Sequence, residues 1–230
     1  MTGWSEFALA MAVFIGSHFL PRLGGLRDRL IGAVGRRIYF AVYGLLSLVL
    51  LGWVIVAAGR APYVELWPQY PWTRWVPNLA MPLAVILTVC GIGLPNRFTL
   101  GGRRRAVFDP ESPGFSAVSR HPLLLALGLW ALSHMAPNGD LAHVVLFGTF
   151  AVLALAAIPL FDMRARRALG ADAPAFFATT AILSPAPLAR KGWLRVMARP
   201  LAFRAGLGLI LWGALLHLHG PVIGVPPFPF

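Results

Sequence analysis

Residues 121–161 read HPLLLALGLWALSHMAPNGDLAHVVLFGTFAVLALAAIPLF, two apolar runs joined by a short polar turn. The second run, over 141–161, contains no Asp, Glu, Lys or Arg. About 20 such residues are enough for a helix to cross the hydrocarbon core of a bilayer. The first run, over 121–136, is shorter and is bounded by Pro122 and Pro137. This stretch therefore predicts a helical hairpin inside a membrane.

The composition of the whole chain agrees with a membrane protein. Of its 230 residues, 58% are hydrophobic and 12% are charged, whereas soluble domains carry about 25% charged residues. Four further segments approach spanning length, over 4–20, 38–58, 78–95 and 203–219. We therefore predict an all-α polytopic bundle of about six transmembrane helices, in a single domain over 1–230.

Positive charge alternates between the loops of this bundle. The loops after the first, third and fifth predicted spans hold eighteen of the 20 Lys and Arg residues, and cytoplasmic loops are the ones enriched in such residues. We expect a multi-pass protein of a bacterial inner membrane, with both termini periplasmic. The net charge of +12 is then explained by loops that meet anionic lipid headgroups, so the expected partner is the bilayer and not nucleic acid.

Several classes of site are excluded by the residues present. The single cysteine, Cys90, cannot form an intramolecular disulfide, and its apolar surroundings predict a small core residue. The sequence contains no His-Glu-x-x-His zinc motif, P-loop, Gly-x-Ser-x-Gly elbow or dinucleotide fingerprint. Histidines are the remaining candidates for chemistry.

An ionisable residue inside a membrane is energetically costly, so each one is a candidate functional residue. His18 lies near the end of the first predicted span, beside Ser17, although a lone histidine there can also simply bond a neighbouring helix. His121 follows Arg120 at a helix N-terminus, which favours an anion such as a carboxylate or phosphate, or else a snorkelling pair. His134 lies roughly 20 Å further along the same helix, so His121 and His134 cannot share one metal.

Several motifs in fixed order resemble the NnrU family of bacterial integral membrane proteins, over about residues 5–170. The family is named for an association with denitrification, so the resemblance implies a nitrite or nitric oxide reductase system as a partner. The motifs are SHFLPRLGGLRDRLIGAVGRRIYFAVYGLLSLVLLGW (17–53), GRAPYVELWP (59–68), LGGRR (100–104), SRHPLLLALGLWALSHMAPNGDLAHVVLFG (119–148) and PLFDMRARRALG (159–170).

The family is also similar to the plastid 15-cis-zeta-carotene isomerase, which binds haem b through histidine and isomerises a carotenoid double bond. The ligands of that relative fall on positions that match His18 and His134. The resemblance thus implies haem b with its iron bound by His18 and His134, and a cofactor-binding role for Arg120 and His121 on the cytoplasmic side. It also makes the chain a candidate haem-dependent isomerase of an apolar polyene such as zeta-carotene.

The two implied ligands differ in depth within the predicted bundle. Residue counting puts His18 toward the inner end of its span and His134 toward the outer end of its own, about 15 Å apart in depth. A haem bound by both must lie between the two rings, nearly parallel to the membrane. If the helices are steep and untilted, His121 lies closer in depth to His18, and that pair is the alternative.

More distantly, Arg120, His121 and Pro122 are similar to part of a motif in isoprenylcysteine carboxyl methyltransferases. Those enzymes bind S-adenosylmethionine with Arg-His-Pro-x-Tyr-x-Gly, whereas this chain has Leu124 in place of the Tyr and Ala126 in place of the Gly. A methyltransferase-like protein using S-adenosylmethionine is therefore one alternative function. A non-catalytic membrane assembly factor with structural histidines is another.

Overall fold

A computed structural model describes residues 3–230, apart from the side chain of Arg22. Helices follow one another along these residues and no strand occurs among them, only an isolated bridge between Glu65 and Asp140. The all-α prediction is confirmed. The helices are α1 (Gly3–Phe19), α2 (Leu26–Val34), α3 (Arg36–Arg60), α4 (Trp75–Gly91), α5 (Pro122–Met135), α6 (Leu141–Leu169), α7 (Ala173–Thr179) and α8 (Lys191–Ile223).

Four helical segments of the described chain are long and apolar enough to cross a membrane. They are Arg36–Arg60, Pro71–Gly91, Leu141–Thr179 and Lys191–Ile223. A fifth arises if α1 and α2 count as one span, although the chain bends by 72° between them. The predicted fourth span is the 14-residue α5, an apolar helix that is shorter than these segments. The chain therefore has the helices of a membrane protein, four or five of them of spanning length.

Two helices extend beyond the apolar segments predicted for them. α6 continues to Leu169, and α8 begins at Lys191 rather than at 203. The added turns are rich in arginine. A hydropathy pattern assigns such charged residues to loops, although arginine has a high propensity to form helices. A helix can also leave the apolar region and continue, because its backbone hydrogen bonds are satisfied within it. The prediction that residues 191–202 belong to a loop is wrong for this reason.

The chain folds into two compact units. The first comprises the residues up to Pro68 together with Asn138–Leu146, and the second comprises Gln69–Pro137 together with Phe147–Phe230. α6 begins in the first unit and the rest of it belongs to the second. The single domain over 1–230 stays a prediction.

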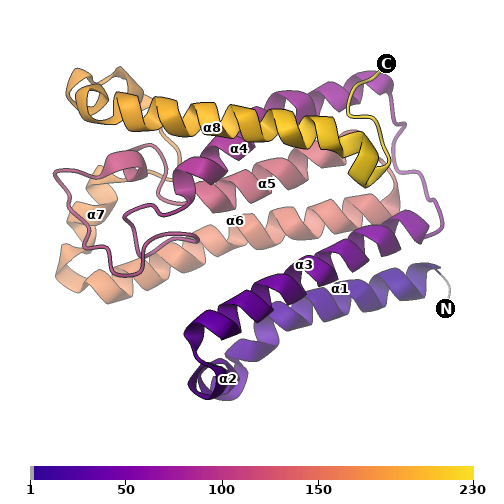
Figure 1. Ribbon diagram of the computed structural model, residues 1–230, viewed down its shortest axis with the longest axis horizontal. Helices are drawn as coiled ribbons and strands as arrows, with labels where there is room; N and C mark the ends of the chain where they lie inside the picture. The colour runs from indigo at the N-terminus through magenta and orange to yellow at the C-terminus, as the bar shows by residue number, and fades with distance from the viewer. Residues whose placement is uncertain (1–2) are drawn as a thin grey trace. The chain divides into compact units, whose positions relative to one another are not determined.

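In the first unit, α1 and α3 lie side by side (Figure 1). The start of α1 meets the end of α3, where Trp53 donates to Glu6 and Arg60 lies 3.6 Å from the same carboxylate. The two helices are therefore antiparallel. α2 connects their other ends, so the loop after the first predicted span contains a helix.

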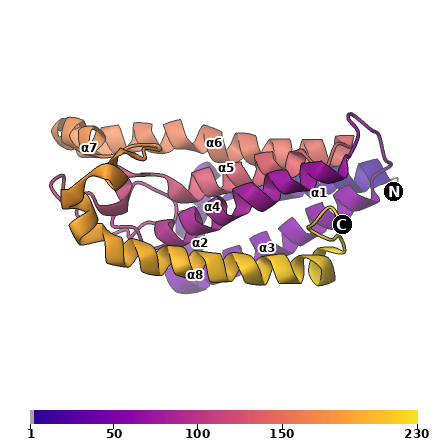
Figure 2. The same cartoon turned by 90° about the horizontal axis from the view of Figure 1, so that it is seen from above.

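In the second unit, α4 packs against both α5 and α8, as Figures 1 and 2 show from two directions. Gly208 of α8 lies against the backbone of Ile86, where a side chain would be crowded. The guanidinium of Arg204 donates to the carbonyls of Val89, Cys90 and Ile92 and so caps the end of α4. Cys90 is a buried core residue, as predicted.

Candidate functional site

A buried ion pair joins the start of α5 to α6 in the second unit. The guanidinium of Arg120 donates to both carboxylate oxygens of Asp162, from Nε at 2.9 Å and from Nη2 at 2.6 Å. The side chains of Arg120 and Asp162 are 9% and 15% exposed. Two parallel bonds of this kind are the strongest arrangement for an arginine and a carboxylate. Asp162 is thus the anion beside the helix N-terminus, supplied by the chain itself.

His121 completes this arrangement. Its Nε2 lies 2.8 Å from Oδ1 of Asp162, and its Nδ1 lies 3.1 Å from Oγ1 of Thr99. A carboxylate oxygen only accepts, so Nε2 carries the proton of the neutral ring and Nδ1 is left to accept. The neutral ring therefore donates from Nε2 to Asp162 and accepts the Thr99 hydroxyl at Nδ1. We call Arg120, His121, Asp162 and Thr99 the Asp162 cluster.

The backbone of Arg120 is also hydrogen-bonded to other segments of the second unit. Its N–H donates to the carbonyl of Ala181 at 2.7 Å, and its carbonyl accepts from the side-chain amide of Asn96 at 3.2 Å. The Asp162 cluster thus joins the loop after α4, the start of α5, the end of α6 and the segment after α7. Its hydrogen bonds hold these four segments of the second unit together.

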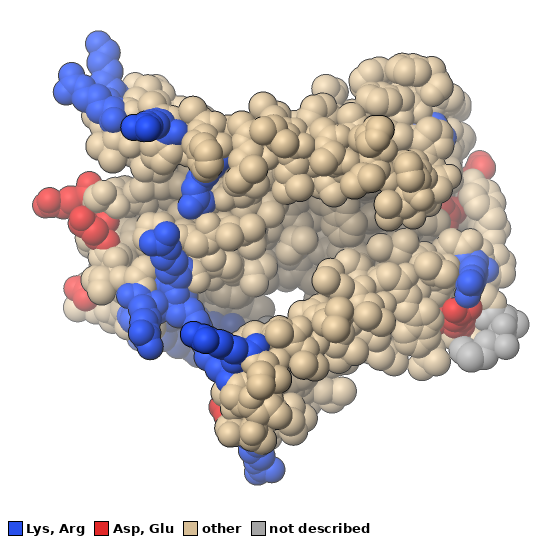
Figure 3. Space-filling view, in the orientation of Figure 1, with Lys and Arg blue, Asp and Glu red and all other residues tan. Residues whose placement is uncertain are grey.

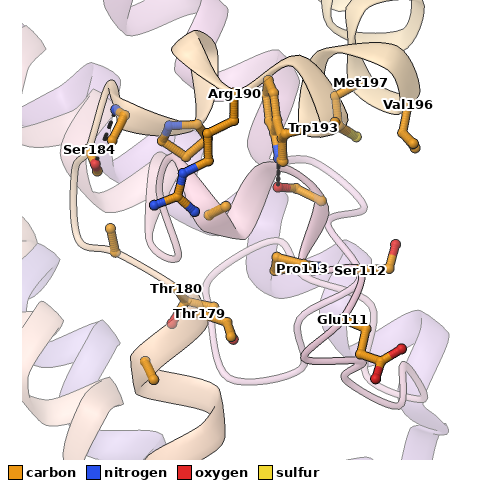
Figure 4. A pocket seen from close by; sticks show the side chains of 17 residues that line it. Glu111, Ser112, Pro113, Thr179, Thr180, Ser184, Arg190, Trp193, Val196 and Met197 are labelled. Atoms are coloured by element: carbon orange, nitrogen blue, oxygen red, sulfur yellow. Dashed lines mark hydrogen bonds between the residues drawn. The ribbon is translucent and has the colours of Figure 1, made fainter.

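The second unit also has a pocket of about 420 Å³ between the loop before η3 (Gly114–Ala117) and the start of α8 (Figure 4). Several of its polar groups are already bonded within the chain. The indole of Trp193 donates to the carbonyl of Gly114, and the hydroxyls of Thr179 and Thr180 donate to carbonyls of α7. None of the histidines lines this pocket.

His18 lies in the last turn of α1, in the first unit. Its Nδ1 is 2.8 Å from the carbonyl oxygen of Phe14, one turn earlier. Since a carbonyl can only accept, Nδ1 carries the proton and the lone pair of the neutral ring lies on Nε2. The Phe14 ring lies 4.5 Å from the imidazole and the Tyr43 ring lies 5.8 Å from it, centre to centre.

His134 lies in the last turn of α5, in the second unit, and its surroundings repeat those of His18. Its Nδ1 is 2.8 Å from the carbonyl oxygen of Trp130, so this ring also carries its proton on Nδ1. The rings of Trp130 and Phe147 lie 5.8 and 5.5 Å from the imidazole. Both imidazoles are therefore partly buried among aromatic side chains.

The two histidines share a local sequence that the histidine positions alone did not reveal. Residues 14–18 read FIGSH and residues 130–134 read WALSH, an aromatic residue, two others, serine and histidine. In both copies the serine hydroxyl donates to the carbonyl that also accepts from the histidine, at 2.7 Å for Ser17 and 3.0 Å for Ser133. A search for this five-residue pattern would have found both positions and excluded His121.

The predicted site residues are divided between the units. His18 belongs to the first unit, whereas Arg120, His121 and His134 belong to the second. The structure brings Arg120 and His121 together through Asp162. Across residues 3–230, no three His, Cys, Asp or Glu side chains converge as they would around a bare metal ion. The pairing of His18 with His134, or with His121, stays a prediction.

Comparison with known proteins gives one family match. A family model described as NnrU protein matches residues 6–227, nearly the whole chain. Neither a search of curated proteins nor a search of solved structures finds a match. The match extends well beyond the 5–170 region that carries the sequence motifs.

Proposed function

This chain belongs to the NnrU family, and we propose that it is a multi-pass inner-membrane protein that binds haem b through His18 and His134. Its long apolar helices support a place in the membrane. We further propose six spans with both termini in the periplasm, in agreement with the loop arginines. Reporter fusions active only in the periplasm should be active at both termini and inactive after residue 105.

One observation carries the haem proposal: the last turns of α1 and α5 hold their histidines in the same way. In each, the Nδ1–H donates to the carbonyl four residues earlier. Histidines that bind metals usually donate their other ring N–H to a carbonyl or carboxylate, which fixes the tautomer and orients the ring. His18 and His134 have this second contact built into their own helices.

The surroundings of both rings also suit a porphyrin. Phe14 and Tyr43 lie around His18, and Trp130 and Phe147 lie around His134. Aromatic and apolar side chains exclude water and lower the local dielectric, two of the means by which a protein tunes haem iron. His121 is a weaker ligand candidate, because both of its ring nitrogens are hydrogen-bonded and its side chain is 1% exposed.

A bound haem b would supply one-electron redox chemistry or an iron centre that polarises a double bond. The first suits a role in denitrification-linked redox or maturation, and the second suits cis–trans isomerisation of an apolar polyene such as zeta-carotene. In either role the residues of this chain bind the iron, orient the ring and exclude water. A redox titration, together with a zeta-carotene isomerisation assay on the reduced and oxidised protein, distinguishes the two.

The optical spectrum of the detergent-purified chain tests haem binding. We expect a Soret band and, on reduction, sharp α and β bands. Each of His18→Ala and His134→Ala should remove most of the bound haem or convert its spectrum to that of a five-coordinate haem. His217→Ala is the matched control, because His217 is exposed on α8 and lacks the five-residue pattern.

Two results would contradict the proposal. One is a chain that stays colourless after expression with excess haem and after reconstitution. The other is a haem spectrum that is unchanged in both His18→Ala and His134→Ala but lost in His121→Ala. The second result would move the ligand to the Asp162 cluster.

A further inference from the structure

The helix α2 lies across the end of the first unit. It is nine residues long, none of its residues is buried, and it is set off by Gly25 and Gly35 with φ of +71° and +80°. These positive φ angles favour glycine. Gly25 lies at the sharp bend between α1 and α2, and Gly35 lies between α2 and α3. The apolar residues Leu26, Leu30 and Val34 recur every four positions and so share one face of the helix.

That face forms one wall of a groove of about 370 Å³. The opposite wall comes from α3, with Ile38 and Val42 among its residues, and the end of α1 closes one side. The surface of the groove is apolar throughout, and two of the side chains that line it, Ile38 and Val42, are 59% and 60% exposed. Its volume lies in the range of roughly 300–1,000 Å³ typical of small-molecule sites. Hydrocarbon fits such a groove better than water does.

Arginines are close in sequence to residues that line this groove, since Arg27 follows Leu26 and Arg36 comes two residues before Ile38. The segment from Leu26 to Arg37 contains four arginines and one carboxylate. The guanidinium groups of Arg27 and Arg36 lie 5.6 and 4.7 Å from the centre of one ring, that of Phe40. Neither forms an ion pair with a carboxylate within the described part of the chain. In Figure 3, blue atoms gather over the α2 end of this unit, whereas α3 is tan between its ends.

We propose that this groove and these two arginines form a site for one anionic phospholipid. The acyl chain lies in the groove between α2 and α3, and the phosphate binds the guanidinium groups of Arg27 and Arg36. Arginine forks match phosphate oxygens in geometry as well as in charge. Two cations held over the same ring without a carboxylate select an anionic headgroup over a zwitterionic one. This site does not depend on the haem proposal.

Photocrosslinking of the full-length chain in neutral detergent tests the site. The probe is phosphatidylglycerol with a diazirine on one acyl chain, and the comparison is phosphatidylcholine with the same label. We expect the phosphatidylglycerol crosslinks to fall on peptides from residues 26–46. Replacing both Arg27 and Arg36 by Gln should weaken this labelling by about fivefold for each arginine, because each contributes about 1 kcal/mol at an anionic surface. Replacing the exposed Arg104 and Arg105 by Gln is the matched control.

A second pair of variants tests the groove itself. Val42→Trp should fill the groove and abolish crosslinking, whereas Leu48→Trp should leave it unchanged, because Leu48 is 66% exposed and lies outside the groove. Equal labelling by phosphatidylcholine, or full labelling of the Arg27 and Arg36 variant, overturns the proposal. Loss of bound haem in Val42→Trp, with no phosphatidylglycerol labelling in the parent protein, assigns the groove to haem instead and also overturns it.

Discussion

Replacing Asp162 by Asn removes the charge that the Asp162 cluster is built around. In the folded chain the carboxylate accepts two bonds from Arg120, at 2.9 and 2.6 Å, and one from His121, at 2.8 Å. The amide keeps the shape of the side chain but leaves the guanidinium of Arg120 without a counter-charge, at 9% exposure. Breaking a buried ion pair by removing one partner costs about 3–5 kcal/mol. We expect a loss of that size in the free energy of unfolding.

The assay is unfolding of the purified chain in mild detergent, followed by tryptophan fluorescence during titration with a denaturing detergent. The matched control is Glu6→Gln, which removes the ion pair with Arg60, whose side chain is 67% exposed. Exposed pairs contribute about 0–1 kcal/mol, so this variant should unfold almost as the parent does. Both variants remove one carboxylate charge, so the difference between their free energies of unfolding measures how much burial adds to the effect of the ion pair.

A double variant tests the reasoning further. In Arg120→Met with Asp162→Leu, neither charge remains. His121 loses its carboxylate partner, which costs about 1–3 kcal/mol, and the carbonyl of Thr180 loses a long bond of 3.5 Å from Arg120. The double variant should therefore be more stable than Asp162→Asn alone. If Asp162→Asn lies within about 1 kcal/mol of the parent, or if the double variant is the less stable of the two, then the cluster does not act as a buried ion pair.

Two further predictions concern close contacts. In Gly139→Ala the new methyl group would collide with the backbone and ring of Trp67. We therefore expect the free energy of unfolding to fall by about 1–3 kcal/mol. The control is Gly148→Ala, which has open space around it and should leave the free energy of unfolding unchanged. Arg204→Met should lower the free energy of unfolding by about 1.5–3 kcal/mol, because the carbonyls at the end of α4 lose a charged donor. Its control, Arg199→Met, lies on an exposed part of α8 and should leave that free energy unchanged. The same detergent titration measures all four.

The helices could be predicted from the sequence where hydropathy decides the structure. Runs such as 38–58 and 141–161 can bury their backbone in lipid only as helices, and they lie in α3 and α6. Hydropathy could not predict α2 or the first turns of α8, because their arginines resemble a loop. Helix formation there follows from backbone hydrogen bonding and from the glycines that set α2 apart, and neither contributes to a hydropathy average.

The candidate site was predictable in part. The sequence singled out Arg120 and His121 as an arginine and a histidine at a helix N-terminus that could hold an anion. It could not show that the anion is Asp162, more than forty residues later, because only tertiary packing brings α6 beside the start of α5. The role of Thr99 was equally hidden, since a threonine in a loop has no distinguishing pattern.

The position of each histidine on its helix accounts for the difference between His121 and the other two. In the last turn of a helix, a histidine can donate to the carbonyl four residues earlier, as His18 and His134 do. At the first turn no such carbonyl exists within the helix, so His121 takes both of its partners from other segments. Tertiary contacts therefore fix both nitrogens of His121, whereas the helix itself orients His18 and His134 with the lone pair on Nε2. A ligand to iron needs that second arrangement, which supports our proposal of His134, rather than His121, as the partner of His18.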